Sequence, residues 1–194
     1  TVTAGQLAEE ACHIEIDVLG KPIGKQDQYA AAFGGINFYE FMKDGRVRVE
    51  ALWNRVTDLQ ELFDSGTLYW TGVQRRAEDV LGEQQKNIPS QIEALKKMTE
   101  LAKSCRLSFL NSENLIGDIA SIVNQGWARK RNYASTVSSS VLDDGIARAI
   151  AAGAHGAKIA GAGGGGFLYV LAHERDKESI TKALSSMSPV SFKY

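Results

Sequence analysis

Residues 158–167 read Lys-Ile-Ala-Gly-Ala-Gly-Gly-Gly-Gly-Phe, and five of these ten residues are glycine. The run is flanked by apolar segments, which we expect to be strands near Ala157 to Ala160 and from Phe167 to Ala172. Glycine costs roughly 0.5–1 kcal/mol per position relative to alanine in a regular element, so four in succession indicate a special demand on the backbone. One interpretation is a loop whose N–H groups approach a phosphate closely. The alternative is a mobile or tightly packed turn.

The glycine run differs from two common nucleotide-binding motifs. No Lys-Ser or Lys-Thr pair follows it, so it is not a P-loop. It leads into a strand rather than a helix, and no suitably placed acidic residue lies beyond, so it is not the dinucleotide-binding fingerprint either. A phosphate site at this run would therefore be of another kind.

Upstream of the glycine run, hydrophobic periodicity and turn residues predict helices and strands in irregular alternation. We expect an amphipathic helix over residues 5–19, a short helix from Gln26 to Phe33, a hairpin around Lys43-Asp44-Gly45, and a strand from Thr67 to Thr71. A helical pattern begins at Gln74. We expect an interruption at Asn87-Ile88-Pro89, because proline disfavours helix in the residue before it.

The same pattern continues to the end of the chain. We expect a helix from Leu115 to about Trp127, a helix from a capping box at Ser140-Val141-Leu142-Asp143 to Ala152, a helix from Lys177 to Met187, and a last short strand. Helices and strands are interleaved without a regular βαβ period. This arrangement favours an α+β fold.

Composition excludes several classes of protein. The chain has 194 residues, 44% hydrophobic and 23% charged, and a net charge of −1, which argues against a partner that is nucleic acid or an anionic membrane. No apolar run approaches the roughly 18 residues of a membrane helix, and the acidic, amphipathic start is not a secretory signal. The two cysteines are far apart, which favours reduced thiols and a cytoplasmic location. The three histidines lack ligand spacing, so we expect no metal site of that kind.

A second candidate site is the segment Gly24-Lys25-Gln26-Asp27-Gln28-Tyr29 at the start of the short helix. A carboxylate at a helix N-terminus and near a cation suits a base that orients a hydroxyl group. The alternative for Asp27 is a helix cap. Lys25 either stabilises the charge of Asp27 or faces solvent.

Together, the two segments resemble the GHMP kinases, which include galactokinase and the homoserine, mevalonate and phosphomevalonate kinases. Three stretches carry the resemblance: IEIDVLGKPIGKQDQYAAAFGGINFYEF (14–41), LYWTGVQRRAEDVL (68–81), and the segment from WARKRN to GFLYVL (127–171). They are similar to the D-glycero-D-manno-heptose 7-phosphate kinase branch. The resemblance extends over about residues 5 to 190.

The resemblance implies a GHMP kinase C-terminal domain, a ferredoxin-like α/β sandwich, over residues 51–194. Residues 1–50 would be the tail end of the N-terminal, S5-like domain. The family's serine-rich Gly-Leu-Gly-Ser-Ser-Ser loop does not occur, and Ser138-Ser139-Ser140 lacks its flanking glycines. The chain thus looks like the C-terminal part of such a kinase. ATP and Mg²⁺ would be the cofactors, with the Mg²⁺ ligands mostly from the N-terminal part.

Site residues follow from the resemblance position by position. Asp27 matches the aspartate at the transferred hydroxyl and would be catalytic, while the amides of Gln26 and Gln28 would bind the sugar. The loop of Gly161, Ala162, Gly163, Gly164 and Gly165 matches the motif at the phosphate-transfer site. Lys25, Arg75 and Lys130 are further candidates for substrate binding, Arg75 and Lys130 through the substrate's own phosphate. For Arg75 and Lys130 the alternative is a solvated helix end.

The implied activity is ATP-dependent phosphorylation of an anomeric hydroxyl, most simply that of D-glycero-D-manno-heptose 7-phosphate, for surface polysaccharide biosynthesis. Two alternatives stay open: a fucose-type or galactose-type kinase, and a non-catalytic, truncated module that acts in binding or assembly. A homodimer or pairing with an N-terminal fragment is open as well. We expect the 194-residue chain alone to bind ATP weakly, and to self-associate through the apolar stripe of helix 5–19.

Overall fold

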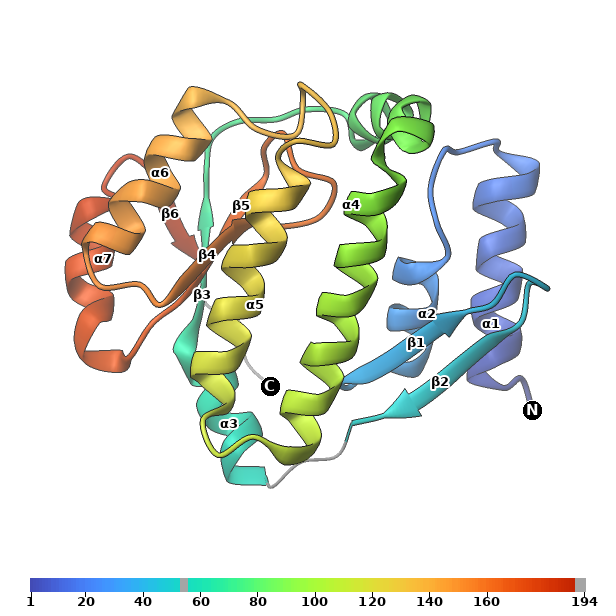
Figure 1. Cartoon of the computed structure of the whole chain (residues 1–194), viewed down its shortest axis with the longest axis horizontal. Helices are drawn as coiled ribbons and strands as arrows, with labels where there is room; N and C mark the ends of the chain where they lie inside the picture. The colour runs from blue at the N-terminus through green and yellow to red at the C-terminus, as the bar shows by residue number, and fades with distance from the viewer. Residues whose placement is uncertain (53–55, 191–194) are drawn as a thin grey trace. The chain divides into compact units, whose positions relative to one another are not determined.

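The computed structural model describes residues 1–52 and 56–190 and divides the chain into two compact units, Thr1–Trp53 and Asn54–Tyr194 (Figure 1). The boundary lies near the one expected after residue 50. The expected domain, residues 51–194, includes residues 53–55 and 191–194, which fall outside the described residues. That residues 1–50 end a preceding domain stays a prediction.

The first unit consists of helices followed by one hairpin. Helix α1 (Ala4–Cys12) continues into a π-helix, η1 (His13–Val18), and the chain then reverses at Gly20, whose φ is +62°. Helix α2 spans Gln26–Phe33, as expected, and ends at Gly34 and Gly35, both with positive φ. The continuation of the first helix as a π-helix was not expected from the sequence.

The expected hairpin is confirmed. Strands β1 (Asn37–Phe41) and β2 (Val47–Ala51) pair antiparallel, with Phe41 opposite Val47 across the turn. Gly45 has φ +86° in this turn, which an L-residue adopts only with strain. Inside the unit, buried Ala8, Cys12 and Tyr29 pack against apolar residues of α2 and the hairpin.

The second unit is built on a four-stranded antiparallel sheet in the order β4-β5-β3-β6. The strands are β3 (Gly66–Trp70), β4 (Gly156–Ile159), β5 (Phe167–Leu171) and β6 (Ser188–Val190). Helices connect β3 to β4 and β5 to β6, whereas β4 and β5 are joined by the glycine run. This is the strand–helix–strand–strand–helix–strand order of a ferredoxin-like fold, which confirms the expected α+β class.

Helices α6 (Ser140–Ala151) and α7 (Lys177–Ala183) contribute buried side chains to one face of this sheet, α5 (Leu115–Lys130) lies against β4, and α4 (Ala77–Asn111) packs against α5. Helix α3 (Val56–Ser65), not expected from sequence, precedes β3, and a short 3₁₀ turn, Glu174–Asp176, precedes α7. Side chains alternate along a strand, so Ile159, Leu168 and Tyr69 lie in register on one face. They are buried with Trp127 of α5 and Leu142 of α6 in one core.

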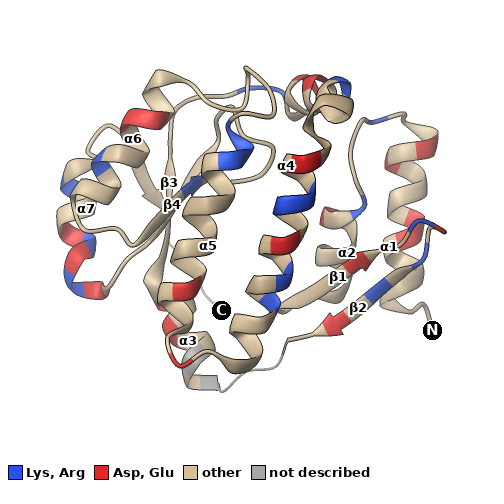
Figure 2. Ribbon diagram, in the orientation of Figure 1, with Lys and Arg blue, Asp and Glu red and all other residues tan. Residues whose placement is uncertain are grey.

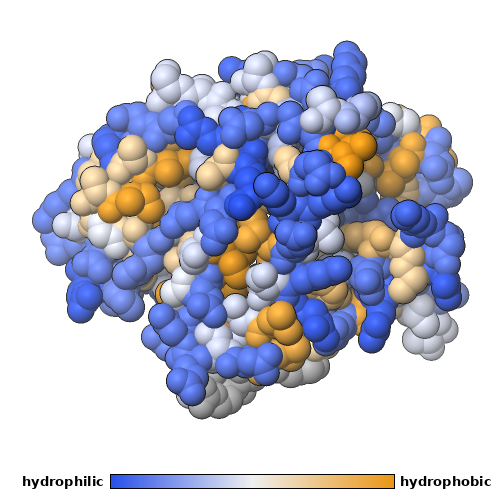
Figure 3. All heavy atoms as spheres, in the orientation of Figure 1, coloured by the Kyte–Doolittle hydropathy of each residue, from blue (hydrophilic) through white to orange (hydrophobic). Residues whose placement is uncertain are grey.

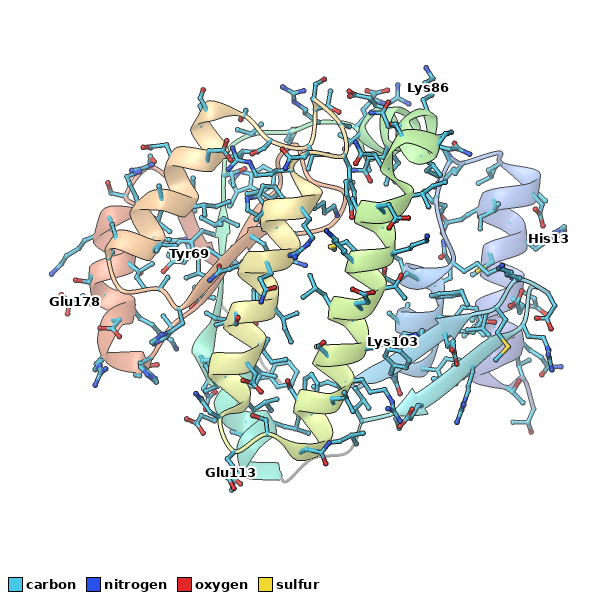
Figure 4. The ribbon with its side chains drawn as sticks, viewed as in Figure 1. His13, Tyr69, Lys86, Lys103, Glu113 and Glu178 are labelled. Carbon is cyan, nitrogen blue, oxygen red and sulfur yellow. The ribbon has the colours of Figure 1, made fainter. Side chains whose placement is uncertain are left out.

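The expected helix break at Asn87-Ile88-Pro89 is wrong, because α4 continues through Pro89. Its first turns are seen end-on in Figure 1 while the remainder runs down the view, and Lys86, labelled in Figure 4, lies on these first turns. Proline removes one hydrogen bond and clashes with the preceding turn, which bends a helix when packing holds both parts. Asn87 supplies such a hold by donating to the carbonyl of Tyr133 at 2.8 Å.

Two further boundaries differ from expectation. The capping box at Ser140 is wrong: Ser139 is the N-cap of α6, without a side-chain cap, and Ser138 instead donates its hydroxyl to Asp143 at 2.8 Å. Helix α7 ends at Ala183 rather than Met187, because Leu184 and Met187 turn into the core and are buried. Burial of apolar side chains thus overrides the helical periodicity.

The surface is mixed in charge. Figure 2 shows positions of acidic and basic residues along α4, where Lys96 pairs with Glu93 at 2.7 Å. Figure 3 shows small apolar patches among hydrophilic side chains. Leu7, Ile14 and Val18 are exposed, so the first helix does present part of its apolar stripe. No helix in the described ranges has the length and hydropathy needed to cross a membrane.

Candidate functional site

Asp27 lies in the first turn of α2 with its side chain exposed. The N-cap of this helix is Lys25, and no side-chain hydrogen bond caps it. Asp27 is therefore not the cap that the sequence left open as an alternative. A carboxylate in a first helical turn is favoured by the helix dipole, and its exposure leaves it accessible to a ligand. Its catalytic role stays a prediction.

Lys25 does not face solvent freely, nor does it pair with Asp27. Its ammonium group donates to both carboxylate oxygens of Glu9 on α1, at 2.9 and 3.2 Å. The hydroxyl of Tyr29 donates to the same carboxylate. Glu9 thus joins α1 to the first two turns of α2, a contact of Lys25 that the sequence did not indicate.

The contacts of Glu9 shift two pKa values in opposite directions: that of the Glu9 carboxyl group falls and that of the Tyr29 phenol rises. The hydrogen bond from Tyr29, followed by that from Lys25, lowers the pKa of Glu9. Burial, followed by the bond to the Glu9 carboxylate, raises the pKa of the Tyr29 phenol. Cys12 lies buried beneath them, and burial raises the pKa of its thiol. The cluster is therefore an ionised carboxylate held between a cation and a neutral phenol, which orders the segment that carries Asp27.

The two glutamines beside Asp27 have different environments. Gln26 is exposed, whereas Gln28 is 7% exposed, and its Oε1 has no hydrogen-bond partner among the described residues. A buried amide oxygen without a partner is uncommon in folded proteins. The expectation that both side chains bind substrate remains a prediction for each.

The glycine run forms a loop between β4 and β5 in the second unit, whereas Asp27 belongs to the first unit. Gly161, Gly163, Gly164, Gly165 and Gly166 all have positive φ, from +64° to +156°. Only glycine adopts such values without strain. The composition of the run is therefore dictated by backbone conformation, as the sequence indicated.

Several elements hold the loop. Gly164 N–H donates to the carbonyl of Val137 at 2.7 Å, and Gly166 N–H to that of Val73 at 2.8 Å. The carbonyl of Gly166 accepts from both the backbone and the hydroxyl of Thr71, at 3.0 and 2.8 Å. Gln84 of α4 donates to the carbonyl of Ala162 at 3.2 Å. The loop is thus tied to β3, to α4 and to the segment before α6.

The middle of the loop also lies against other backbone. A Cβ at Gly163 would be 2.9 Å from the Val137 carbonyl oxygen, one at Gly164 would be 2.8 Å from that of Thr136, and one at Gly165 would be 2.4 Å from that of Val73. All three distances are shorter than real Cβ contacts. Close packing on three sides fits the tightly packed turn that the sequence left open beside phosphate binding.

The loop keeps donors that the protein does not use. Within the described part of the chain, the N–H groups of Gly161, Ala162, Gly163 and Gly165 have no hydrogen-bond acceptor. Successive N–H groups in a turn with positive φ form a concave site for an anion. The residues present therefore fit a phosphate group.

Arg75 lies beside this loop. Its Cδ would be 3.3 Å from a Cβ on Gly164, and its side chain is exposed. A hollow of about 340 Å³ opens here, lined by Trp70, Gln74, Arg75, Arg76 and Gly166. The neighbouring Arg76 forms an ion pair with Glu78 at 3.1 Å. For Arg75, which lies beside the loop, no ion pair is found among the described residues.

Lys130, at the end of α5, reaches the same loop. Its ammonium group donates to the carbonyl of Gly161 at 2.6 Å. The structure thus brings Lys130, Arg75 and the glycine loop together in the second unit. Lys130 has a structural contact that the sequence did not indicate, and its binding to a substrate phosphate stays a prediction.

Glu83 of α4 is a residue that the sequence did not single out. It accepts hydrogen bonds from Ser135 and Thr136, in the segment that runs beside the glycine loop. These bonds, that of Thr136 first, lower the pKa of Glu83 to about 2. No local signal could have identified this contact, because its partners are more than fifty residues apart in the chain.

The described residues hold no group of three or more histidine, cysteine, aspartate or glutamate side chains that could bind a metal ion. His155 and His173 do contact each other, with ring centroids 4.4 Å apart.

The described geometry can be compared with known proteins. Residues 92–189 match the family model of the GHMP kinases C terminal. The chain belongs to the GHMP kinase family. The D-glycero-alpha-D-manno-heptose 7-phosphate kinase of Campylobacter jejuni is 32% identical over 181 residues, which cover 92% of this chain and 53% of that protein.

Two other known proteins are similar to this chain. The bifunctional fucokinase/GDP-fucose pyrophosphorylase of Arabidopsis thaliana is 29% identical over 82% of this chain and 16% of that protein. The crystal structure of a D-glycero-D-manno-heptose 1-phosphate kinase from Bacteroides thetaiotaomicron aligns with a TM-score of 0.73 and 28% identity, over 99% of this chain and 53% of that one. The chain therefore spans about half the length, or less, of the curated relatives it matches.

Proposed function

We propose that this chain supplies part of the active site of an ATP-dependent sugar kinase that phosphorylates an anomeric hydroxyl group. Its acceptor is D-glycero-D-manno-heptose 7-phosphate, and the product is the 1,7-bisphosphate. The observation that carries this function is the glycine loop, which is fixed on several sides while the N–H groups of Gly161, Ala162, Gly163 and Gly165 lack acceptors among the described residues. Membership of the GHMP kinase family supports the reaction type.

The glycine loop stabilises the negative charge of the phosphoryl group that is transferred. Phosphoryl transfer needs mainly positioning and electrostatic stabilisation, and ATP supplies the group that is transferred. Backbone donors already fixed in place stabilise negative charge without reorganising during the reaction. Gly161, Ala162, Gly163, Gly164 and Gly165 form this part of the site, with Arg75 and Lys130 at its edge for the substrate's own phosphate.

Asp27 orients the attacking hydroxyl group and accepts its proton. Its exposed carboxylate in the first turn of α2 supports this role, because no described contact occupies it. Gln26 and Gln28 bind sugar hydroxyl groups, and Lys25 fixes the helix start through Glu9 rather than touching Asp27. The Mg²⁺ ligands come mostly from outside this chain, and residues 1–50 end the N-terminal domain.

A heptose phosphate is favoured over an unphosphorylated sugar because two cations, Arg75 and Lys130, lie at the glycine loop. The similarity to a heptose 7-phosphate kinase over 92% of the chain supports the same choice. The second candidate is a fucose-type kinase, which the fucokinase relative favours. A cytoplasmic location and a role in surface polysaccharide synthesis follow if the acceptor is heptose 7-phosphate.

The test is ADP release by the full-length protein with heptose 7-phosphate, fucose or galactose, together with ³¹P NMR of the product. We expect turnover with heptose 7-phosphate and a new phosphate signal from the anomeric position. Asp27→Asn should abolish most of the turnover with heptose 7-phosphate. Asp44→Asn, which changes a carboxylate in the hairpin turn of the same unit, should leave the turnover unchanged. Turnover with fucose alone would establish the second candidate. No turnover with any acceptor would contradict the kinase function and favour the alternative of a non-catalytic module.

A further inference from the structure

Glu83 fastens α4 to the segment that lies beside the glycine loop. One carboxylate oxygen accepts from the backbone N–H and the hydroxyl of Ser135, at 2.8 and 2.9 Å. The other oxygen accepts from the hydroxyl of Thr136 at 2.6 Å. Three charge-assisted hydrogen bonds onto one carboxylate fix two successive residues in position.

The next residue of this segment is bonded to the glycine loop. Val137 is fully buried, and its carbonyl oxygen accepts the N–H of Gly164 at 2.7 Å. The carbonyl of Thr136 is so close to Gly164 that a Cβ there would be 2.8 Å away. A displacement of the segment therefore cannot leave the middle of the loop where it is.

Glu83 itself is not placed to take part in chemistry. Its Oε1 accepts two hydrogen bonds from the protein and its Oε2 accepts one, so three of about four acceptor sites of the carboxylate are used within the structure. A general base also works best with a pKa near the working pH, and these contacts hold the pKa of Glu83 at about 2. A carboxylate of this kind holds a structure in place.

We propose that Glu83 is a positioning residue for nucleotide binding: through Ser135, Thr136 and the Val137 carbonyl, it holds the glycine loop in the shape that directs its free N–H groups at a phosphate. This role rests on the proposed function, because it needs the loop to bind the phosphates of ATP. It goes beyond that function by naming the support on which the loop depends.

The test is Glu83→Ala in the full-length protein, with Glu93→Ala as the matched control. Glu93 is a carboxylate on the same helix that pairs only with exposed Lys96 among the described contacts. For Glu83→Ala we expect the KM for ATP to rise about ten-fold or more, and the KM for the sugar acceptor to stay within about two-fold. Glu93→Ala should change neither. Thr136→Val, which removes one of the three bonds, should give a smaller change in the same direction.

A second measurement does not depend on catalysis. Hydrogen exchange of the Gly164 amide reports its bond to Val137, and Glu83→Ala should raise its exchange rate at least about ten-fold at a pH where the protein stays folded. If Glu83→Ala does not fold, the same measurement is made on Thr136→Val. Unchanged exchange overturns the link between Glu83 and the loop. Raised exchange with an unchanged kcat and an unchanged KM for ATP overturns the positioning role and leaves a stabilising one.

Different results would overturn the kinase function and the positioning role of Glu83. If the wild-type protein shows no phosphotransfer with any acceptor, the proposed function fails and the positioning role falls with it. If the wild-type protein is active and Glu83→Ala alters the KM for the sugar rather than for ATP, only the positioning role is overturned.

Discussion

Replacing Gly164 by alanine should destabilise the second unit more than the same change at Gly161. Both glycines have positive φ, +77° and +64°, so a Cβ costs roughly 1–2 kcal/mol at either position. The surroundings differ. Around Gly161 no atom lies within 4 Å of the added Cβ, whereas at Gly164 it would be 2.8 Å from the Thr136 carbonyl and 3.1 Å from Val80.

The contact at Gly164 adds the cost of overpacking, which is typically about 1–3 kcal/mol. We therefore expect a total loss of about 2–5 kcal/mol for Gly164→Ala and about 1–2 kcal/mol for Gly161→Ala. With a urea m-value of about 2 kcal/mol/M, the midpoint of the first variant should lie roughly 0.5–1.5 M below that of the second.

The assay is urea unfolding followed by tryptophan fluorescence, because Trp127 is buried in the core of the second unit. Gly161→Ala is the matched control, since it makes the same chemical change in the same loop. Equal midpoints for the two variants would refute the reasoning: the loop would then yield to a Cβ at Gly164, and its packing against Thr136 and Val137 would not be rigid.

Three further outcomes are expected. Asp27→Asn should lower kcat in the full-length protein by ~10²–10⁴-fold and leave the thermal midpoint nearly unchanged, as steady-state kinetics and calorimetry can check; an equal fall in stability would instead make Asp27 structural. The pKa of Glu83 is lowered from 4.5 to about 2 on folding, so its contribution to stability is complete above the higher value and lost as pH falls through the lower one. The midpoint difference between wild type and Glu83→Gln in urea should accordingly shrink between pH 5 and 2, and a constant difference would contradict the assignment. Tyr29→Phe removes the hydrogen bond to Glu9 and should cost about 1–2 kcal/mol in urea unfolding; no loss would show that Lys25 alone holds Glu9.

Local turn chemistry explains which elements could be predicted from the sequence. The hairpin was predictable because Asp44-Gly45 stands between two apolar runs, and Gly45 does adopt positive φ. Helix α2 was predictable because Gly34 ends it. These signals lie within a few residues of the structure they determine.

Elements whose form depends on distant packing were not predictable. Pro89 suggested a helix end, yet α4 continues because contacts such as that from Asn87 to Tyr133 hold the bent helix together. The residues that support the glycine loop could not be identified from the sequence for the same reason. Glu83 and Thr136 carry no motif, and their meeting depends on how α4 packs against the segment before α6.

The glycine loop satisfies two demands at once, which explains why its glycines are not equivalent. At Gly161 and Gly166 the backbone has positive φ, but the space around a Cβ is open, so conformation alone requires glycine. At Gly163, Gly164 and Gly165 a Cβ would also press on the backbone of neighbouring segments. The central glycines therefore allow the loop to sink against rigid backbone, and this contact fixes the direction of the N–H groups that remain free. A loop so fixed can bind an anion without the entropic cost of ordering itself, which is the form of preorganisation that stabilises charge during phosphoryl transfer.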